Sequence, residues 1–174
     1  NTKHKGTCAH PRRCATGKGT PMTKIMFVCL GNICRSPMAE FVLKDLVKKA
    51  GREAEFEIAS AATSTEELGN PVYPPARREL KAHGIDCAGK TARQLSWADY
   101  NRYDLFIGMD RGNLRAMDRI LRGDPDRKIR RLLDYTDRPG DVADPWYTGE
   151  FGVTWRDVVE GCQGLLRALD QGTA

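Results

Sequence analysis

The chain has 174 residues, of which 40% are hydrophobic, and this length and composition suit one globular domain. No stretch approaches the roughly 18 to 20 apolar residues that a membrane-spanning helix needs, so we expect no membrane segment. The formal net charge is +5, but residues 1–21 hold five of the 28 basic residues and none of the 23 acidic ones. The rest is formally neutral, which argues against a nucleic-acid-binding face.

Residues 1–21 contain no Ile, Leu, Val or Phe, so they cannot bury an apolar core. We predict that they form a flexible basic extension of a single domain at residues 22–174. The segment carries four potential metal ligands, His4, Cys8, His10 and Cys14, whose spacing is not a standard zinc pattern, so we expect no metal site. Its start lacks the apolar block of a secretory signal peptide, and we expect a cytoplasmic protein with reduced cysteines.

From residue 24 onward, short apolar runs alternate with segments of helical periodicity. The apolar runs predict four strands: KIMFVC at 24–29, FEIAS at 56–60, YDLFIGM at 103–109 and KIRRLL at 128–133. The periodic segments predict helices at 37–50, 74–84, 110–121 and 154–169, and a further short start at Ser96. We expect Thr154 to cap the last helix. This alternation predicts an α/β fold with a parallel sheet covered on both faces.

The segment between the first strand and the first helix predicts a phosphate site. Cys29 ends the strand, and ligands bind beyond the carboxyl ends of parallel strands. The helix that begins near Ser36 directs its free N–H groups at the same place. The loop consists of Leu30, Gly31, Asn32, Ile33 and Cys34. Its Gly-Asn pair tolerates unusual dihedral angles, so the loop can turn its N–H groups toward an oxyanion. Arg35 adds a fork for two phosphate oxygens.

The same surroundings favour a nucleophilic thiolate at Cys29, because cations and helix N-termini stabilise its charge. Attack on phosphorus gives a cysteinyl-phosphate intermediate, and we expect Ser36 to donate a hydrogen bond to the sulfur. The leaving group needs a proton, and Asp144 in DVADPWYTGEF is the predicted general acid. We expect the aromatic residues after it, Trp146 and Tyr147, to form the pocket wall.

With VCLGNICRSPMAE and a late DPWY, the chain resembles the low-molecular-weight protein tyrosine phosphatase family from about Lys24 to Leu169. SAATS at 60–64, ARQL at 92–95 and GMDRGNL at 108–114 are similar as well. The resemblance implies a flavodoxin-like, doubly wound sheet of four parallel strands with helices on both faces. It also implies Cys29 as nucleophile, Arg35 as phosphate clamp and Asp144 as acid, with no metal and no cofactor. We expect a monomer that acts on phosphotyrosine proteins.

Two positions depart from the family pattern. Many members have an aromatic residue, flanking the substrate ring, at the position that aligns with Glu66. A histidine that braces the phosphate loop in some members aligns with Gly89, which leaves Asn32 and Ser60 to brace it. These departures leave the preference among phosphopeptides open and the chemistry intact.

Several alternatives remain at this point. Cys34 either fills space in the loop or forms a disulfide with Cys29 that protects it from over-oxidation. An arsenate reductase needs a relay of neighbouring cysteines, and Cys87 and Cys162 are far apart in the sequence. A protein-arginine phosphatase of the same family tends to have threonine where this chain has Ile33. The last alternative, a non-catalytic phosphate-binding module, would be favoured if Cys29 or Asp144 were replaced, but both residues are present.

Overall fold

The computed structural model describes residues 21–174, so the predicted metal ligands and nearly all of the predicted extension lie outside the described residues. The strands are β1 (Thr23–Cys29), β2 (Phe56–Ala62), β3 (Leu105–Gly108) and β4 (Ile129–Arg131). The α-helices are α1 (Arg35–Lys49), α2 (Pro74–Ala82), α3 (Arg111–Ile120), α4 (Pro145–Thr148) and α5 (Phe151–Gln171). Short 3-10 helices span η1 (Glu53–Glu55), η2 (Trp97–Asp99) and η3 (Leu132–Tyr135).

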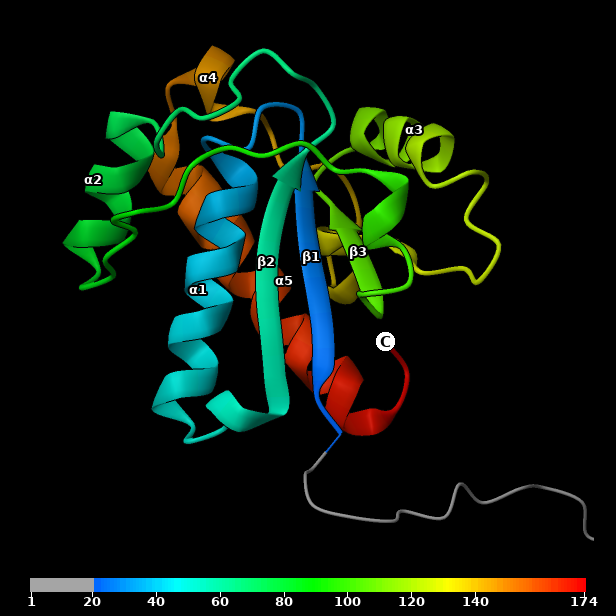
Figure 1. Ribbon diagram of the computed structural model, residues 1–174. Coiled ribbons are helices and arrows are strands. Elements are labelled where there is room, and N and C mark those ends of the chain that lie inside the picture. Colours follow the sequence, from blue (N-terminus) through cyan, green and yellow to red (C-terminus); the bar gives the residue numbers. More distant parts are fainter. Residues whose placement is uncertain (1–20) are drawn as a thin grey trace, which may run out of the picture.

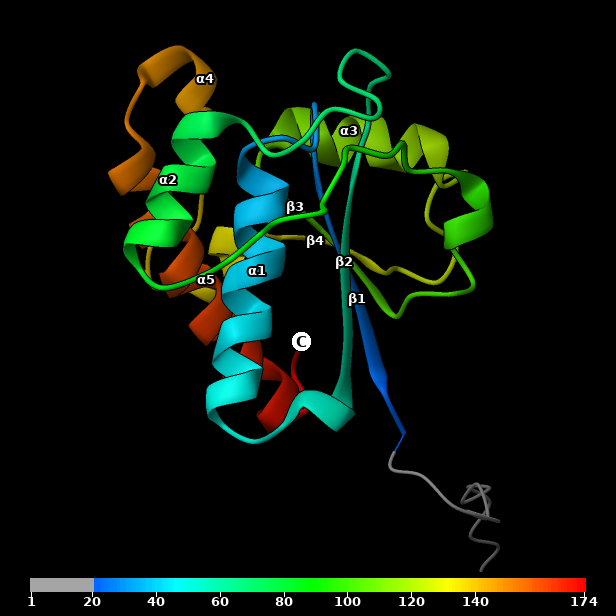
Figure 2. The same cartoon turned by 60° about the vertical axis from the view of Figure 1, so that its left-hand side comes forward.

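The four strands form one parallel sheet, as the sequence predicts, and their order is β2-β1-β3-β4 (Figures 1 and 2). β1 pairs with β2 along its whole length, from Thr23 opposite Phe56 to Cys29 opposite Ala62. On its other side β1 pairs with β3. Cys29 therefore lies at the carboxyl end of a central strand, where open parallel sheets bind their ligands.

Helices cover both faces of the sheet, which confirms the doubly wound, flavodoxin-like architecture (Figures 1 and 2). Successive side chains of β1 point to opposite faces. Ile25 and Phe27 belong to a core shared with α1, α2 and α5, whereas Met26 and Val28 belong to a core shared with α3 and the η2 region. Because β1 is buried on both sides, it reads as a continuous apolar run. Among residues 21–174, no helix is both long and apolar enough to span a bilayer.

Several predicted boundaries differ from the observed ones by a few residues, and those of β4 and α5 have a structural reason. The fourth strand ends at Arg131, because its partner strand β3 ends at Gly108, which pairs with Arg131, and the buried Leu132 and Leu133 begin η3 instead. The last helix begins at Phe151 after Glu150, so Thr154 is a buried helix residue and not its cap. The earlier start follows from Gly149, whose left-handed φ of 71° ends α4 and turns the chain directly into α5.

Candidate active site

The loop after β1 keeps its backbone N–H groups free. Its carbonyl oxygens accept hydrogen bonds from neighbouring N–H groups: Cys29 from Thr63 at 3.0 Å, Leu30 from Ser64 at 3.0 Å and Ile33 from Tyr73 at 2.9 Å. In a trans peptide, the next N–H points opposite to its carbonyl. Within the described chain, no group accepts a hydrogen bond from the N–H groups of residues 31–34. The loop thus presents a set of donors suited to a tetrahedral oxyanion.

A buried chain of side-chain hydrogen bonds braces this loop and reaches the sulfur. Asn32, with a left-handed φ of 58°, donates from Nδ2 to Ser36 Oγ at 2.8 Å and to Ser60 Oγ at 2.9 Å. Ser60 donates its own proton to Glu40 Oε1 at 2.6 Å. Because Ser36 Oγ already accepts from Asn32, its hydrogen is free for Cys29 Sγ, 3.0 Å away. Glu40 is 4% exposed, and as an acceptor it fixes the direction of the whole chain.

Arg35, the first residue of α1, is held in place by residues from distant elements. Its Nη1 donates to Asp110 Oδ2 at 2.7 Å and to the Val142 carbonyl at 2.9 Å. The side chain is only 3% exposed. Burial alone lowers the pKa of the Arg35 guanidinium, but the Cys29 sulfur and the hydrogen bond with Asp110 raise it above its ordinary value. Arg35 is therefore a fixed positive charge beside the loop donors.

Sequence reasoning identified Asp110 only as the start of α3. In the structure Asp110 has two roles. Its Oδ1 accepts from the Asn113 N–H at 2.7 Å and caps the helix, and its Oδ2 binds Arg35. The DRGN pattern was the available signal for the cap. No local pattern indicated the arginine partner, which is 75 residues away in the chain.

Asp144 caps α4, a short helix that the sequence reading missed. Its Oδ1 accepts from the Trp146 N–H at 3.0 Å, and its Oδ2 lies 3.4 Å from Arg35 Nη2. Pro145 at the first helical position favours this turn. Trp146 and Tyr147 are 53% and 80% exposed, and Tyr73 supports the Trp146 ring at a centroid distance of 4.8 Å. The acid candidate and the aromatic wall thus come from one capped turn.

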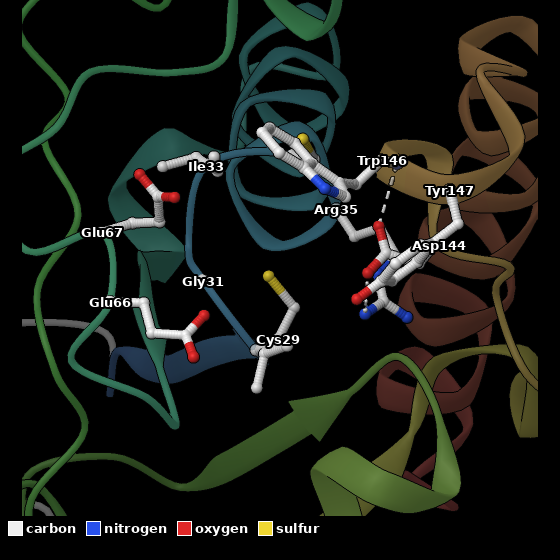
Figure 3. A pocket seen from close by; sticks show the side chains of 11 residues that line it. Cys29, Gly31, Ile33, Arg35, Glu66, Glu67, Asp144, Trp146 and Tyr147 are labelled. Carbon is white, nitrogen blue, oxygen red and sulfur yellow. Dashed lines mark hydrogen bonds and ion pairs between the residues drawn. The ribbon is translucent and has the colours of Figure 1, made fainter.

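One pocket gathers most of the predicted site residues (Figure 3). It is lined by Cys29, Leu30, Gly31, Ile33, Cys34, Arg35, Glu66, Glu67, Asp144, Trp146 and Tyr147. Asn32 and Ser36 do not line it: both side chains are buried behind the loop in the bracing chain. Glu67 was missed, since the sequence reading selected only Glu66. The two glutamates lie opposite Asp144 and the aromatic wall, with Cys29 between (Figure 3).

The cysteines differ in their surroundings. Cys34 lines the pocket with Cys29, and both are free thiols. Burial and then the charge of the neighbouring Cys29 raise the pKa of Cys34 to about 12, which keeps it protonated at neutral pH. Cys87 and Cys162 are buried and line no part of this pocket, so they supply no thiol relay. Within residues 21–174, no group of His, Cys, Asp and Glu is arranged to hold a metal ion.

A cysteine sulfur beneath free amide donors and a fixed arginine is an arrangement suited to phosphoryl transfer through cysteine. The comparisons with known proteins agree. Residues 24–174 match the family described as low molecular weight phosphotyrosine protein phosphatase. The chain is 38% identical, over 86% of its length and 97% of the relative, to the low molecular weight protein-tyrosine-phosphatase YfkJ of Bacillus subtilis. The crystal structure of YfkJ covers 91% of this chain and 100% of its own, with a TM-score of 0.85 and 37% identity.

Two further structures are similar. The low molecular weight protein tyrosine phosphatase from Streptococcus pyogenes is 41% identical, with a TM-score of 0.76, over 85% of this chain and 93% of that one. The crystal structure of a Drosophila arginine phosphatase is 28% identical, with a TM-score of 0.78, over 84% of this chain and 98% of that one. The chain belongs to the low molecular weight phosphotyrosine protein phosphatase family. It is a phosphoric monoester hydrolase that acts on phosphotyrosine through the cysteinyl-phosphate intermediate characteristic of this family.

Proposed function

We propose that Cys29 is the nucleophile, Arg35 the phosphate clamp and Asp144 the general acid of this hydrolysis. In the first step the Cys29 thiolate attacks phosphorus, the bond between phosphorus and the tyrosine oxygen breaks, and Asp144 gives its proton to that oxygen. The N–H groups of the Leu30–Cys34 loop and the guanidinium stabilise the charge on the three equatorial oxygens. The product is a cysteinyl phosphate and a free tyrosine side chain.

In the second step a water attacks the phosphorus, and the Asp144 carboxylate takes its proton. The bond between phosphorus and sulfur breaks, inorganic phosphate forms, and the sulfur leaves as a thiolate that receives the Ser36 hydrogen bond. The observation that carries this proposal is that the Cys29 sulfur lies in one pocket with Arg35 and Asp144, below a loop whose donors are unbonded. No step requires a metal or a cofactor.

We propose that the phosphotyrosine ring occupies the space between Ile33 and the wall of Trp146 and Tyr147. A phenyl phosphate is long enough to reach a sulfur at the bottom of such a pocket, and a phosphoserine is shorter. The test compares kcat/KM for phosphotyrosine, phosphoserine and phosphoarginine versions of one peptide. We expect phosphotyrosine to be hydrolysed fastest, and a higher kcat/KM for either of the others would contradict the proposal.

Phosphoarginine is the second candidate substrate. The similarity to the Drosophila arginine phosphatase and the carboxylates of Glu66 and Glu67 in the pocket favour it, because a guanidinium group pairs with carboxylates. Ile33 favours the aromatic ring, since its branched apolar side chain offers no partner to a guanidinium. We therefore rank phosphotyrosine first.

The Arg35→Lys variant is expected to lose about 10- to 100-fold in kcat/KM, because an ammonium group cannot make the bidentate contact with phosphate. Lysine also cannot bind Asp110, Val142 and the phosphate in the fixed geometry of the guanidinium. Steady-state kinetics on a phosphotyrosine peptide give the value. Arg138→Lys is the control, since Arg138 is 59% exposed and pairs with Asp157 and Glu160, none of which lines the pocket. A loss below about tenfold would rule out Arg35 as the transition-state clamp.

The Cys34→Ser variant is expected to turn over substrate but to recover a smaller fraction of its activity after peroxide and added thiol. Peroxide converts the Cys29 thiolate to a sulfenic acid, and attack by the Cys34 sulfur releases water and forms a disulfide that thiols reduce. Oxidation removes the thiolate charge that helps to raise the pKa of Cys34, which favours this attack. Recovered activity is measured against Cys87→Ser. Equal recovery in wild type and Cys34→Ser would refute the redox role.

We further propose that residues 22–174 form the phosphatase domain, with residues 1–21 as an extension outside it, and that the enzyme acts as a cytoplasmic monomer on phosphotyrosine proteins. The family match to residues 24–174 supports this division. Sedimentation velocity on the full chain measures the oligomeric state. Deletion of residues 1–21 is expected to leave kcat/KM on a phosphotyrosine peptide unchanged.

A further inference from the structure

The rim of the pocket opposite the aromatic wall carries two consecutive carboxylates, Glu66 and Glu67. Glu66 is exposed and Glu67 is half-buried, and both line the pocket (Figure 3). In the part of the chain that the structure describes, neither forms an ion pair, and Glu67 accepts a hydrogen bond from the neutral Asn70 amide at 2.7 Å. Two negative charges therefore face the space beside a bound substrate.

Two hydrogen bonds hold the backbone of the turn that carries these carboxylates. The Asn70 N–H donates to the Glu67 carbonyl at 2.9 Å, and the Gly69 N–H donates to the Ala92 carbonyl at 2.9 Å. A carbon added at Gly31 would lie 3.4 Å from Glu67 Cγ, so the Glu67 stem packs over the phosphate loop. The rim charges thus act at the entrance to the phosphate site, and not on a distant surface.

The negative charges of the rim repel a phosphate ester, and positively charged residues in the substrate would offset this repulsion. The other charged residues that line the pocket are Arg35 and Asp144. Arg35 is 3% exposed, lies at the floor and already contacts the carboxylates of Asp110 and Asp144. It supplies little positive potential at the entrance, where Glu66 and Glu67 repel further negative charge.

We propose that Glu66 and Glu67 select phosphotyrosine peptides with a lysine or arginine close to the phosphotyrosine, and disfavour peptides with acidic flanks. The inference rests on the proposed function, because the ring must enter the pocket for its flanking residues to lie across this rim. Leu30 lines the same entrance and is 43% exposed, which gives the stem of a lysine or arginine an apolar contact. Acidic flanks meet like charges there, which gives discrimination by repulsion.

The test uses two phosphotyrosine peptides of equal length that differ only in having lysine or glutamate on both sides of the phosphotyrosine. We expect wild type to show a kcat/KM ratio, basic over acidic peptide, of about 3 to 10, since exposed charge pairs are each worth a few-fold. The ratio should fall as salt is added, because screening weakens interactions between exposed charges. The ratio is the readout, so a general change in activity cancels.

Two double variants and one control assign the effect to the rim. Glu66→Gln/Glu67→Gln should bring the ratio to about 1, and Glu66→Lys/Glu67→Lys should invert it. The control Glu53→Gln/Glu57→Gln removes the same charge at the opposite end of β2, away from the pocket, and should retain the wild-type ratio. Circular dichroism melting of each variant checks that it is folded under the assay conditions.

A phosphoarginine peptide in the same assay distinguishes a failure of the charge selection from a failure of the proposed function. If both phosphotyrosine peptides are hydrolysed with equal kcat/KM in wild type, or if the glutamine variant keeps the ratio, the charge selection is wrong and the proposed function stands. If phosphoarginine alone is hydrolysed, both are wrong. A ratio that the lysine variant inverts and the control leaves unchanged supports the proposal.

Discussion

The Cys29→Ser variant is expected to lose turnover on the order of 10⁶-fold, as other enzymes do when their nucleophile is removed, and still to bind inorganic phosphate. A serine hydroxyl is not ionised at neutral pH and cannot replace the thiolate as nucleophile. The proposed phosphate ligands are the loop N–H groups and Arg35, which the substitution leaves in place. Steady-state turnover of a phosphotyrosine peptide and calorimetric titration with phosphate measure the two effects.

Cys87→Ser is the matched control for the nucleophile. Cys87 is also a buried thiol, 2% exposed, but it does not line the pocket, so this variant should retain turnover. Turnover near the wild-type value in Cys29→Ser would refute the assignment of the nucleophile. Loss of phosphate binding together with turnover would show that the sulfur, and not the loop, holds the anion.

The Asp144→Asn variant is expected to lose about 10²- to 10⁴-fold on a phosphotyrosine peptide and much less on para-nitrophenyl phosphate. The tyrosine leaving group, with a pKa near 10, needs a proton as it departs, whereas nitrophenolate is already a stable anion. Asparagine still has a side-chain oxygen that accepts from the Trp146 N–H, so α4 keeps its cap and the aromatic wall its position. The comparison therefore isolates proton transfer.

Asp141→Asn is the control for the acid, because Asp141 is the nearest acidic neighbour in the sequence. Its Oδ1 accepts from the Arg111 N–H at 3.1 Å and from Arg131 Nη1 at 3.0 Å, and it does not line the pocket. We expect a small effect on both substrates. A small and equal loss on both substrates in Asp144→Asn would mean that the acid lies elsewhere. A large loss in Asp141→Asn would point to that residue.

Much of the fold was predictable because strand and helix periods are local properties of the sequence. β1 is an unbroken apolar run because it is covered on both faces. In the second half of α1, Val42, Leu43 and Val47 are buried while Lys44 and Lys48 are exposed, which gives the helical period. The start of α5 was not predictable from its apolar residues. It depended on how Gly149 ends α4. The burial of Thr154 follows from tertiary packing, which no local pattern in the sequence indicates.

One part of the candidate site was likewise predictable from the sequence, and another part was not. The candidate phosphate loop could be predicted from the sequence, because Cys29, the Gly-Asn turn and Arg35 lie within one strand–loop–helix unit whose geometry follows from covalent connection and backbone preferences. The side chains that surround this loop come from distant segments, and the sequence did not predict which of them meet. Asp144 meets Arg35 across 109 residues, and Glu67 packs over Gly31 from another loop. Such contacts arise because the parallel sheet brings the carboxyl ends of β1, β2 and β3 to one edge, and no local pattern encodes which side chains meet there.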